Sequence, residues 1–422
     1  MKVLALGGSG DMGRMAVAIL LDFPDLVSSI TVADKNYEHA IAFVEMVGSD
    51  KLSAVEIDVT EHDKLVKLIS DHDLVVNTVG PFYKFEVPII EAVIEAKKNY
   101  LDINDDWKPT LDALEYDDKA KEAGITAVIG IGASPGITNI MAVQACSKLD
   151  EIDEIITAFG YSLETKAGRK PKYYVKPVKF AKKLNLEVGS MESTSAKDGP
   201  NSALMHLLWE TIEKIPSFKD GKMIEIDPLT ETETRYEFPG FKDMYTVHIG
   251  HPEPVTLPRT IKANAISCVM YVGKTATEIT RKYSQKLKNK ELTIEEASSA
   301  LNKEWDELEN QALQVRDQEI MNQYLGGPPV LSVIAIGTKD GKRKKVGVTL
   351  EHEPFGGMPG ETSVPLGIVT IMLIEGKITQ KGVLTPEEVF KDNPMEFFDR
   401  IAPYCGKNLT GKDILIEREE DI

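Results

Sequence analysis

A glycine-rich turn near the start of the chain constrains the fold more than any other feature. The turn reads Gly8-Ser9-Gly10-Asp11-Met12-Gly13, and it lies between the apolar run Lys2–Leu6 and the helical pattern Met12–Leu21. In a GxGxxG turn the first two glycines let the backbone approach a pyrophosphate, and the third lets the helix pack closely on the strand. Because the helix N-terminus then faces the phosphates, the sequence predicts a dinucleotide-binding turn here.

The first third of the chain alternates short apolar runs with helical patterns. The expected strands are residues 2–6, 28–33, 54–59, 74–78, 100–103 and 126–131, and the expected helices include 12–21, 37–47, 63–70 and 87–96. Strands alternating with helices of this length predict an α/β fold, a Rossmann-type, doubly wound parallel sheet. After Gly136 the pattern becomes mixed, and the runs 330–336 and 344–351 predict a hairpin around Lys339-Asp340-Gly341.

The chain is too long for one ordinary core, so two domains are expected from its 422 residues. We expect residues 1–138 to form the Rossmann dinucleotide-binding domain. Residues 139–359 are expected to form a second, α+β domain that binds the substrate.

Three further loops are expected at the edge of the sheet where a cofactor binds. Asp34 ends the second strand about 20 residues after the third glycine, where a carboxylate accepts hydrogen bonds from the adenosine ribose. It repels a 2′-phosphate, so NAD is favoured, while the ammonium group of Lys35 keeps NADP possible. Asp58-Val59 is expected near the adenine, with an ordinary turn as the alternative. The loop expected beside the nicotinamide is Asn77-Thr78-Val79-Gly80-Pro81-Phe82.

Composition argues against several classes of partner. The net charge of −18 disfavours nucleic acid and anionic lipid. No segment approaches the roughly 18 apolar residues of a membrane helix, and the apolar start is too short for a signal peptide, so a cytoplasmic protein is expected. The three cysteines are isolated and the seven histidines dispersed, so we expect no metal site.

Several motifs along the chain resemble those of one enzyme family. They are GGSGDMG, ADKN, NTVGPF, Tyr100-Leu101-Asp102, Gly132-Ala133-Ser134-Pro135-Gly136-Ile137-Thr138-Asn139, Thr256-Leu257-Pro258-Arg259, and LIEGKI followed by GVLTPE. The sequence resembles the saccharopine dehydrogenase-like family, which includes saccharopine reductases, lysine 6-dehydrogenases and carboxynorspermidine dehydrogenases. The resemblance implies that residues 360–422 return to pack on the Rossmann domain, and that residues 139–359 contain a mixed sheet and form a homodimer. It also implies an enzyme that moves a hydride between a nicotinamide and a nitrogen-bearing carbon of an amino-acid-like substrate or polyamine precursor. Ser134 stands where saccharopine reductases typically have an aspartate, which argues against saccharopine itself.

Such a reaction needs an aligned substrate and a proton acceptor near the nicotinamide. Asp102 is the first candidate, as a base or as the carboxylate that binds the substrate ammonium; a turn aspartate is the alternative. His251 is a second acid–base candidate because histidine titrates near neutrality. The expected substrate contacts are Tyr83, Asp102, Ser134, Pro135, Gly136, Asn139 and Arg259, the last as a carboxylate clamp.

Two other functions stay open at this stage. One is a Rossmann dehydrogenase acting on a hydroxyl or aldehyde, and the other is a non-catalytic NAD-binding protein, because the fold alone hosts many chemistries.

Overall fold

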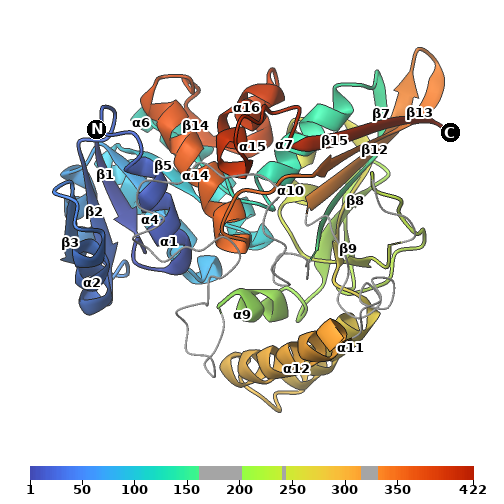
Figure 1. Cartoon of the computed structure of the whole chain (residues 1–422), viewed down its shortest axis with the longest axis horizontal. Coiled ribbons are helices and arrows are strands. Elements are labelled where there is room, and N and C mark those ends of the chain that lie inside the picture. The colour runs from blue at the N-terminus through green and yellow to red at the C-terminus, as the bar shows by residue number, and fades with distance from the viewer. Residues whose placement is uncertain (161–201, 240–243, 315–330) are drawn as a thin grey trace. The chain divides into compact units, whose positions relative to one another are not determined.

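The computed structural model describes residues 1–160, 202–239, 244–314 and 331–422 (Figure 1). The chain divides into two compact units. The first holds Met1–Ile137 and Glu353–Gly411. The second holds the described residues between Thr138 and His352, together with Lys412–Ile422.

The first unit is built on a seven-stranded sheet whose neighbours are all parallel, in the order β14-β6-β5-β4-β1-β2-β3. The order reverses between β1 and β4, which is the switch point where ligands of open α/β sheets bind. The Rossmann-type fold expected from the sequence is therefore confirmed. The strands are β1 (Lys2–Leu6), β2 (Ser29–Asp34), β3 (Leu52–Glu56), β4 (Leu74–Asn77), β5 (Asn99–Asp102), β6 (Thr126–Val128) and β14 (Gly382–Leu384).

Helices cover this sheet because its strands are apolar on both faces. All four residues of β4 are buried, as are four of the five in β1, and such near-continuous burial is typical of parallel strands. The helices are α1 (Asp11–Leu20), α2 (Tyr37–Val47), α3 (His62–Ser70), α4 (Phe82–Ala96), α5 (Trp107–Leu114), α6 (Asp117–Ala123), α14 (Met358–Ile374), α15 (Pro386–Phe390) and α16 (Pro394–Cys405).

The return of the chain completes this unit. Helix α14 packs against α1 so closely that a Cβ on Gly367 would lie 2.7 Å from Cγ2 of Ile19. The hydroxyl of Ser363 also donates to the carbonyl of Met12 at 2.8 Å. Strand β14 then pairs with β6, so residues far apart in the sequence share one core.

The second unit contains a mixed sheet in the order β15-β13-β12-β7-β11-β8-β9, with β10 paired to β11. Strands β7 and β11 are parallel, and the other pairs are antiparallel. The mixed sheet expected from the sequence is confirmed. Its strands are β7 (Glu151–Gly160), β8 (Ile215–Lys219), β9 (Lys222–Ile226), β10 (Val247–His248), β11 (Ala263–Tyr271), β12 (Leu331–Lys339), β13 (Lys342–Leu350) and β15 (Leu415–Asp421).

The hairpin expected around Lys339-Asp340-Gly341 is formed by β12 and β13. Asp340 and Gly341 both adopt positive φ, at 52° and 73°, which is the two-residue turn that Asp-Gly favours.

The C-terminal tail corrects one expectation. Residues 412–422 belong to the second unit and not to the Rossmann-type unit, because β15 pairs with β13 along its whole length (Figure 1). Opposite charges fit this pairing, since Lys344 and Lys345 of β13 face the acidic end of β15.

The described helices of the second unit flank its sheet, and α11 and α12 lie side by side (Figure 1). They are α7 (Ile137–Cys146), α9 (Ser202–Trp209), α10 (Glu253–Thr256), the 3-10 turn η1 (Leu257–Arg259), α11 (Lys274–Lys288) and α12 (Ile294–Gln314). Strands β8 and β9 form an antiparallel pair, while residues 161–201 lie outside the described residues. No helix in the described part of the chain has both the length and the apolar character needed to span a bilayer.

Candidate active site

The glycine turn after β1 leaves bare backbone at the start of α1. Gly7 has φ of 69°, and a Cβ on Gly13 would lie 2.2 Å from the carbonyl oxygen of Gly7, so only glycine fits the helix against the turn. Gly10 caps α1 without a side-chain hydrogen bond and is exposed. The turn therefore fits a pyrophosphate, because its exposed backbone and the helix N-terminus meet at one place.

Asp34 ends β2 beside this turn. Its Oδ2 accepts a hydrogen bond from the hydroxyl of Ser9 at 2.5 Å, and its Oδ1 accepts one from the backbone N–H of Asn36 at 3.0 Å. These two hydrogen bonds fix the carboxylate in an open pocket, which is lined by Asp34, Lys35, Asn36, Tyr37, Glu38 and Glu56. This is the geometry that ribose binding at the end of the second strand needs.

Lys35 pairs with the carboxylate of Asp58. Its ammonium lies 2.8 Å from Oδ2, and Thr60 donates to Oδ1 through both its backbone N–H and its hydroxyl. Lys35 and then Thr60 hold the pKa of Asp58 well below its usual range. Val59, the next residue, is buried in the core of the first unit. Of these two residues after β3, Asp58 therefore pairs with Lys35, whereas Val59 packs in the core.

The loop after β4 braces the glycine turn. The hydroxyl of Thr78 lies 3.1 Å from the carbonyls of both Leu6 and Gly7. Asn77 is fully buried, donating to the hydroxyl of Tyr100 at 2.8 Å and accepting from the N–H of Val79 at 2.9 Å.

The start of α4 follows this loop. The Gly80–Pro81 peptide is cis, and Phe82 is buried behind it. Tyr83 is 40% exposed, so its side chain is accessible to a small molecule, while its backbone N–H donates to Asp106 at 3.0 Å.

Asp102 ends β5 and is fully buried. Its Oδ1 accepts from the backbone N–H groups of Gly130 at 2.7 Å and Asn104 at 2.9 Å. These bonds fasten the loop after β6 to the end of β5. The alternative expected from the sequence was a turn aspartate, and the two hydrogen bonds that Oδ1 accepts agree with that alternative.

Glu86 of α4 is an unexpected partner of Asp102. Burial, and then the nearby Asp102 carboxylate, raise the pKa of Glu86 well above its usual value. Burial also raises the pKa of Asp102, although hydrogen bonds from Glu86 and Gly130 oppose that rise. The hydroxyl of Tyr100 lies 3.4 Å from the Glu86 carboxyl. We infer a neutral Glu86 that donates to Asp102, because two buried carboxylates side by side do not both ionise.

The loop after β6 is tightly folded. Gly136 has φ of 120°, and a Cβ there would lie 2.1 Å from the carbonyl oxygen of Gly132. A Cβ on Gly130 would meet Pro135 at 2.9 Å, and the Ser134–Pro135 peptide is cis. These constraints hold Ser134, Pro135 and Gly136 in one conformation at the carboxyl edge of the sheet.

In the second unit, Asn139 and Thr138 bind the loop that carries α10. Asn139 donates to the hydroxyl of Thr256 at 3.2 Å, and the hydroxyl of Thr138 donates to Oε1 of Glu253 at 2.7 Å. All four side chains are buried. Arg259 ends η1 and is exposed.

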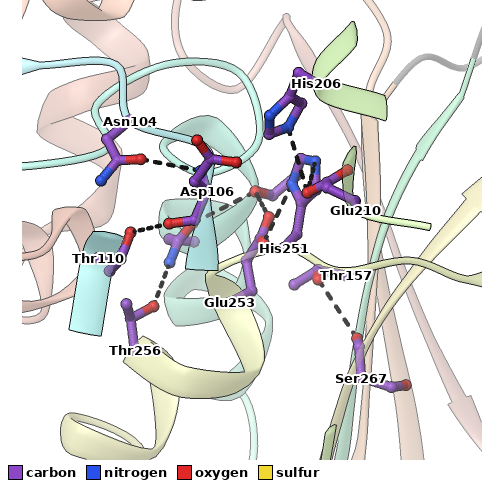
Figure 2. Close-up of polar contacts among 12 residues, drawn as sticks. Asn104, Asp106, Thr110, Thr157, His206, Glu210, His251, Glu253, Thr256 and Ser267 are labelled. Carbon is purple, nitrogen blue, oxygen red and sulfur yellow. Dashed lines mark hydrogen bonds and ion pairs between the residues drawn. The ribbon is translucent and has the colours of Figure 1, made fainter. Parts of the chain in front are cut away.

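His251 lies in a buried polar cluster, with Glu210 and His206 from the end of α9 and Glu253 from α10 (Figure 2). Burial opposes protonation of His251, but Glu210 and Glu253 together raise its pKa. His206 and Glu210 were not expected from the sequence, although their spacing of four residues places both on one side of a helix. Glu86 was also missed, although it interrupts the apolar stripe of α4.

Two models of known families match the chain. One is the saccharopine dehydrogenase NADP binding domain, which matches residues 3–128. The other is the saccharopine dehydrogenase C-terminal domain, which matches residues 132–406.

Individual relatives agree with these matches. Carboxyaminopropylagmatine dehydrogenase of Synechocystis is 24% identical over 420 residues, covering 92% of each chain. Carboxynorspermidine synthase of Vibrio cholerae is 30% identical over 176 residues, covering 37% of this chain and 42% of that protein. The solved structure of saccharopine dehydrogenase (L-Glu forming) from Saccharomyces cerevisiae has a TM-score of 0.58, 16% identity and 99% coverage of both chains, which shows a shared fold.

Proposed function

The chain belongs to the saccharopine dehydrogenase family, and from that premise we propose that it oxidises or forms a CH–NH bond in a carboxylated polyamine precursor. It is a nicotinamide-dependent oxidoreductase, as its matched domains and its relatives show. The observation that carries the proposal is the glycine turn with Asp34 beside it, within a chain whose remaining two thirds match the C-terminal domain of the same family.

Different residues of the first unit bind different parts of the cofactor. The glycine turn and the N-terminus of α1 hold the pyrophosphate, and Asp34 accepts hydrogen bonds from the adenosine ribose. When bound, the nicotinamide accepts the hydride of the amine carbon or returns it to the imine. In the oxidative direction the amine becomes an imine, a proton is released, and water then hydrolyses the imine.

We propose a positioning role for Asp102. Its carboxylate holds Gly130 and Asn104 in place and therefore fixes the loop that contains Ser134, Pro135 and Gly136. Loops at this edge of the sheet line the ligand site of such folds. Among the expected substrate contacts we retain Tyr83 and Arg259, because both are exposed. Asn139 is buried against Thr256, so we propose that it supports the α10 loop.

The proposed substrate class rests on two observations. A relative that matches along 92% of both chains is named for a carboxyaminopropyl derivative of agmatine, a polyamine precursor. The net charge of −18 attracts a polycation and repels a substrate rich in carboxylates such as saccharopine.

We propose NAD in preference to NADP, although the matching family domain is named for NADP. The open pocket at the end of β2 contains the carboxylates of Asp34, Glu38 and Glu56. Its lysine, Lys35, is already paired with Asp58. A 2′-phosphate would therefore meet several negative charges, whereas a ribose hydroxyl donates to Asp34.

The test is a substrate panel followed by the absorbance of NADH or NADPH. Carboxyaminopropylagmatine, carboxynorspermidine, saccharopine and lysine are each incubated with NAD+ and with NADP+. We expect the highest kcat/KM for one of the two carboxylated polyamines with NAD+. Turnover of alcohols in place of amines, or cofactor binding without turnover of any amine, would refute the proposal.

We further propose that residues 1–138 with 360–411 bind the cofactor and that residues 139–359 contact the substrate and form a homodimer. Sedimentation velocity on the full chain would test the dimer, and a monomer at micromolar concentration would contradict it. A cytoplasmic location also remains a prediction, which fractionation of the producing cells would test.

A further inference from the structure

Three side chains with metal-binding atoms converge in the second unit. His206 and Glu210 come from successive turns at the end of α9, and Glu210 continues the helix through an N–H bond to the carbonyl of His206. His251 comes from the loop after β10. The side chains of Glu210 and His251 are 2% and 6% exposed and that of His206 is 19% exposed, so the group is buried but reachable on one side.

Two of the three distances between these atoms are close to the edge of a coordination tetrahedron. Oε1 of Glu210 lies 3.3 Å from Nε2 of His206 and 3.6 Å from Nε2 of His251. Zinc bound by nitrogen and oxygen at about 2.0–2.1 Å separates its tetrahedral ligands by about 3.3 Å. The three side chains point toward one another in Figure 2, and one ligand atom from each lies within 4.8 Å of the others.

The residues around His251 orient its ring so that one nitrogen faces Glu210 and the other faces Glu253. Its Nε2 faces Glu210, while its Nδ1 lies 3.6 Å from Oε2 of Glu253. Glu253 in turn accepts a hydrogen bond from Thr138, and the imidazole packs against Phe159 with ring centroids 4.5 Å apart. Histidines that bind metals usually present one nitrogen to the ion and the other to such a carboxylate.

The charge of the cluster also suits a divalent cation. Glu210 and Glu253 are both buried, and two carboxylates taken out of water are costly unless cations or hydrogen bonds compensate them. An ion of charge +2 bound to Glu210 and the two imidazoles would place positive charge next to both carboxylates.

We propose that His206, Glu210 and His251 bind one Zn²⁺, with Glu253 orienting His251 and a fourth position left for water or a ligand. Three protein ligands with an open position are typical of zinc sites that act on a ligand. The proposal replaces the acid–base role that the sequence suggested for His251 and the expected lack of a metal site. Spacing along the sequence could not reveal this site because its ligands come from separate segments.

The proposal is independent of the proposed substrate, and metal content tests it directly. The tag-free full-length protein is stripped with a chelator, reloaded with Zn²⁺, freed of excess metal by gel filtration and analysed by mass spectrometry. We expect about one Zn²⁺ per chain, in keeping with a single site. His206→Gln and His251→Gln should each retain less than about a tenth of that amount, because two ligands hold zinc far less tightly than three.

Two matched variants locate the site. His248→Gln removes a partly buried histidine of β10 and should keep the zinc. Cys268→Ser removes the thiol of a neighbouring group formed by His251, Glu253 and Cys268, and it should also keep the zinc. Loss of zinc in Cys268→Ser with retention in His206→Gln would overturn the assignment.

Folding is checked separately, by circular dichroism and by binding of NADH to the first unit. A Co²⁺-loaded protein should show the intense visible bands of a tetrahedral site, and His206→Gln should lose them. A wild-type protein that takes up no zinc or cobalt while still binding NADH would refute the metal site and leave the proposed oxidoreductase untouched. A protein that holds its full zinc content but does not turn over amines would refute the proposed reaction and leave the metal site untouched.

Discussion

Asp34 and Lys35 are neighbours with opposite charges and different partners. Asp34 is held by the Ser9 hydroxyl at 2.5 Å beside the glycine turn, whereas Lys35 reaches away to Asp58 at 2.8 Å. The sequence shows both charges side by side, but it cannot show which of them is already paired. The pairing makes the end of β2 acidic, and this is why we prefer NAD.

Replacing Asp34 by Asn tests that preference. The amide still accepts from Ser9 but loses the charge-assisted bond to ribose, which is worth about 1.5–3 kcal/mol. We expect the dissociation constant for NADH to rise about 10- to 100-fold, while that for NADPH changes less or falls. Asp50→Asn, an exposed carboxylate elsewhere in the unit, is the control and should change neither. Equal losses for both cofactors in Asp34→Asn would contradict the model of charge selection.

Glu86 gives a prediction for the pH dependence of stability. The folded chain keeps the Glu86 proton above the usual carboxyl pKa of 4.5, because burial and then Asp102 raise it, whereas the unfolded chain releases it. Stability therefore falls as the pH rises through this window, by at most about 1.4 kcal/mol per pH unit for one proton. Glu86→Gln stays neutral and can still donate to Asp102, so this loss should disappear.

The measurement is the melting temperature of both proteins between pH 5 and pH 8. The difference between Glu86→Gln and wild type should shift in favour of the variant as the pH rises. Glu91→Gln, on the exposed face of the same helix, should keep the wild-type dependence. A constant difference between Glu86→Gln and wild type would show that Glu86 is ionised in the folded chain.

At the scale of elements, the glycine turn must let α1 pack closely and must let the cofactor approach, and separate variants can test these two requirements. A Cβ on Gly13 would collide with the Gly7 carbonyl at 2.2 Å, whereas one on Gly10 would lie 3.4 Å from that oxygen at an ordinary φ of −72°. Gly13→Ala should lower the free energy of unfolding by about 3 kcal/mol or more. Gly10→Ala should fold normally yet weaken NADH binding more than tenfold, because its methyl group occupies the approach of the pyrophosphate.

The control for this pair is Gly48→Ala at the end of α2, where φ is 61°. It should cost about 1 kcal/mol of stability and leave NADH binding unchanged. Strong NADH binding by Gly10→Ala would mean that the cofactor does not bind at this turn.

Several elements of both units could be predicted because each is specified locally. Glycines, apolar strands and helical periodicity lie within a few residues of one another, so β1, α1 and the hairpin of β12 and β13 follow from the sequence. Contacts between distant segments do not. His206 meets His251 only after folding, and the carboxyl of Glu86 meets Asp102 only because α4 returns along β5.

At the scale of the whole molecule, the described residues pass between the two units three times. It leaves the first unit after Ile137, returns at Glu353 and leaves again at Lys412. Neither unit is therefore a continuous segment. The last passage was wrongly predicted because residues 415–421 are mostly charged, and their sequence does not show the sheet to which they belong.

The last strand is expected to stabilise the second unit without affecting the cofactor turn of the first. Ile414 and Leu415 are buried, and burying an aliphatic side chain contributes about 1.5–3 kcal/mol. β15 also covers the edge of β13, and an uncovered strand edge promotes aggregation. A chain that ends at Gly411 should therefore lose several kcal/mol of stability in the second unit and aggregate on mild heating, while it still binds NADH below that temperature.

A full-length variant with Glu419→Gln, Glu420→Gln and Asp421→Asn separates backbone pairing from charge. It keeps β15 but loses the ion pairs to Lys344 and Lys345, which are partly exposed and contribute about 0–1 kcal/mol each. Its melting temperature should therefore stay close to wild type, and light scattering should show no aggregation. If it behaved like the truncated chain, surface charge rather than strand pairing would hold the tail, and the sheet order of the second unit would explain little of its stability.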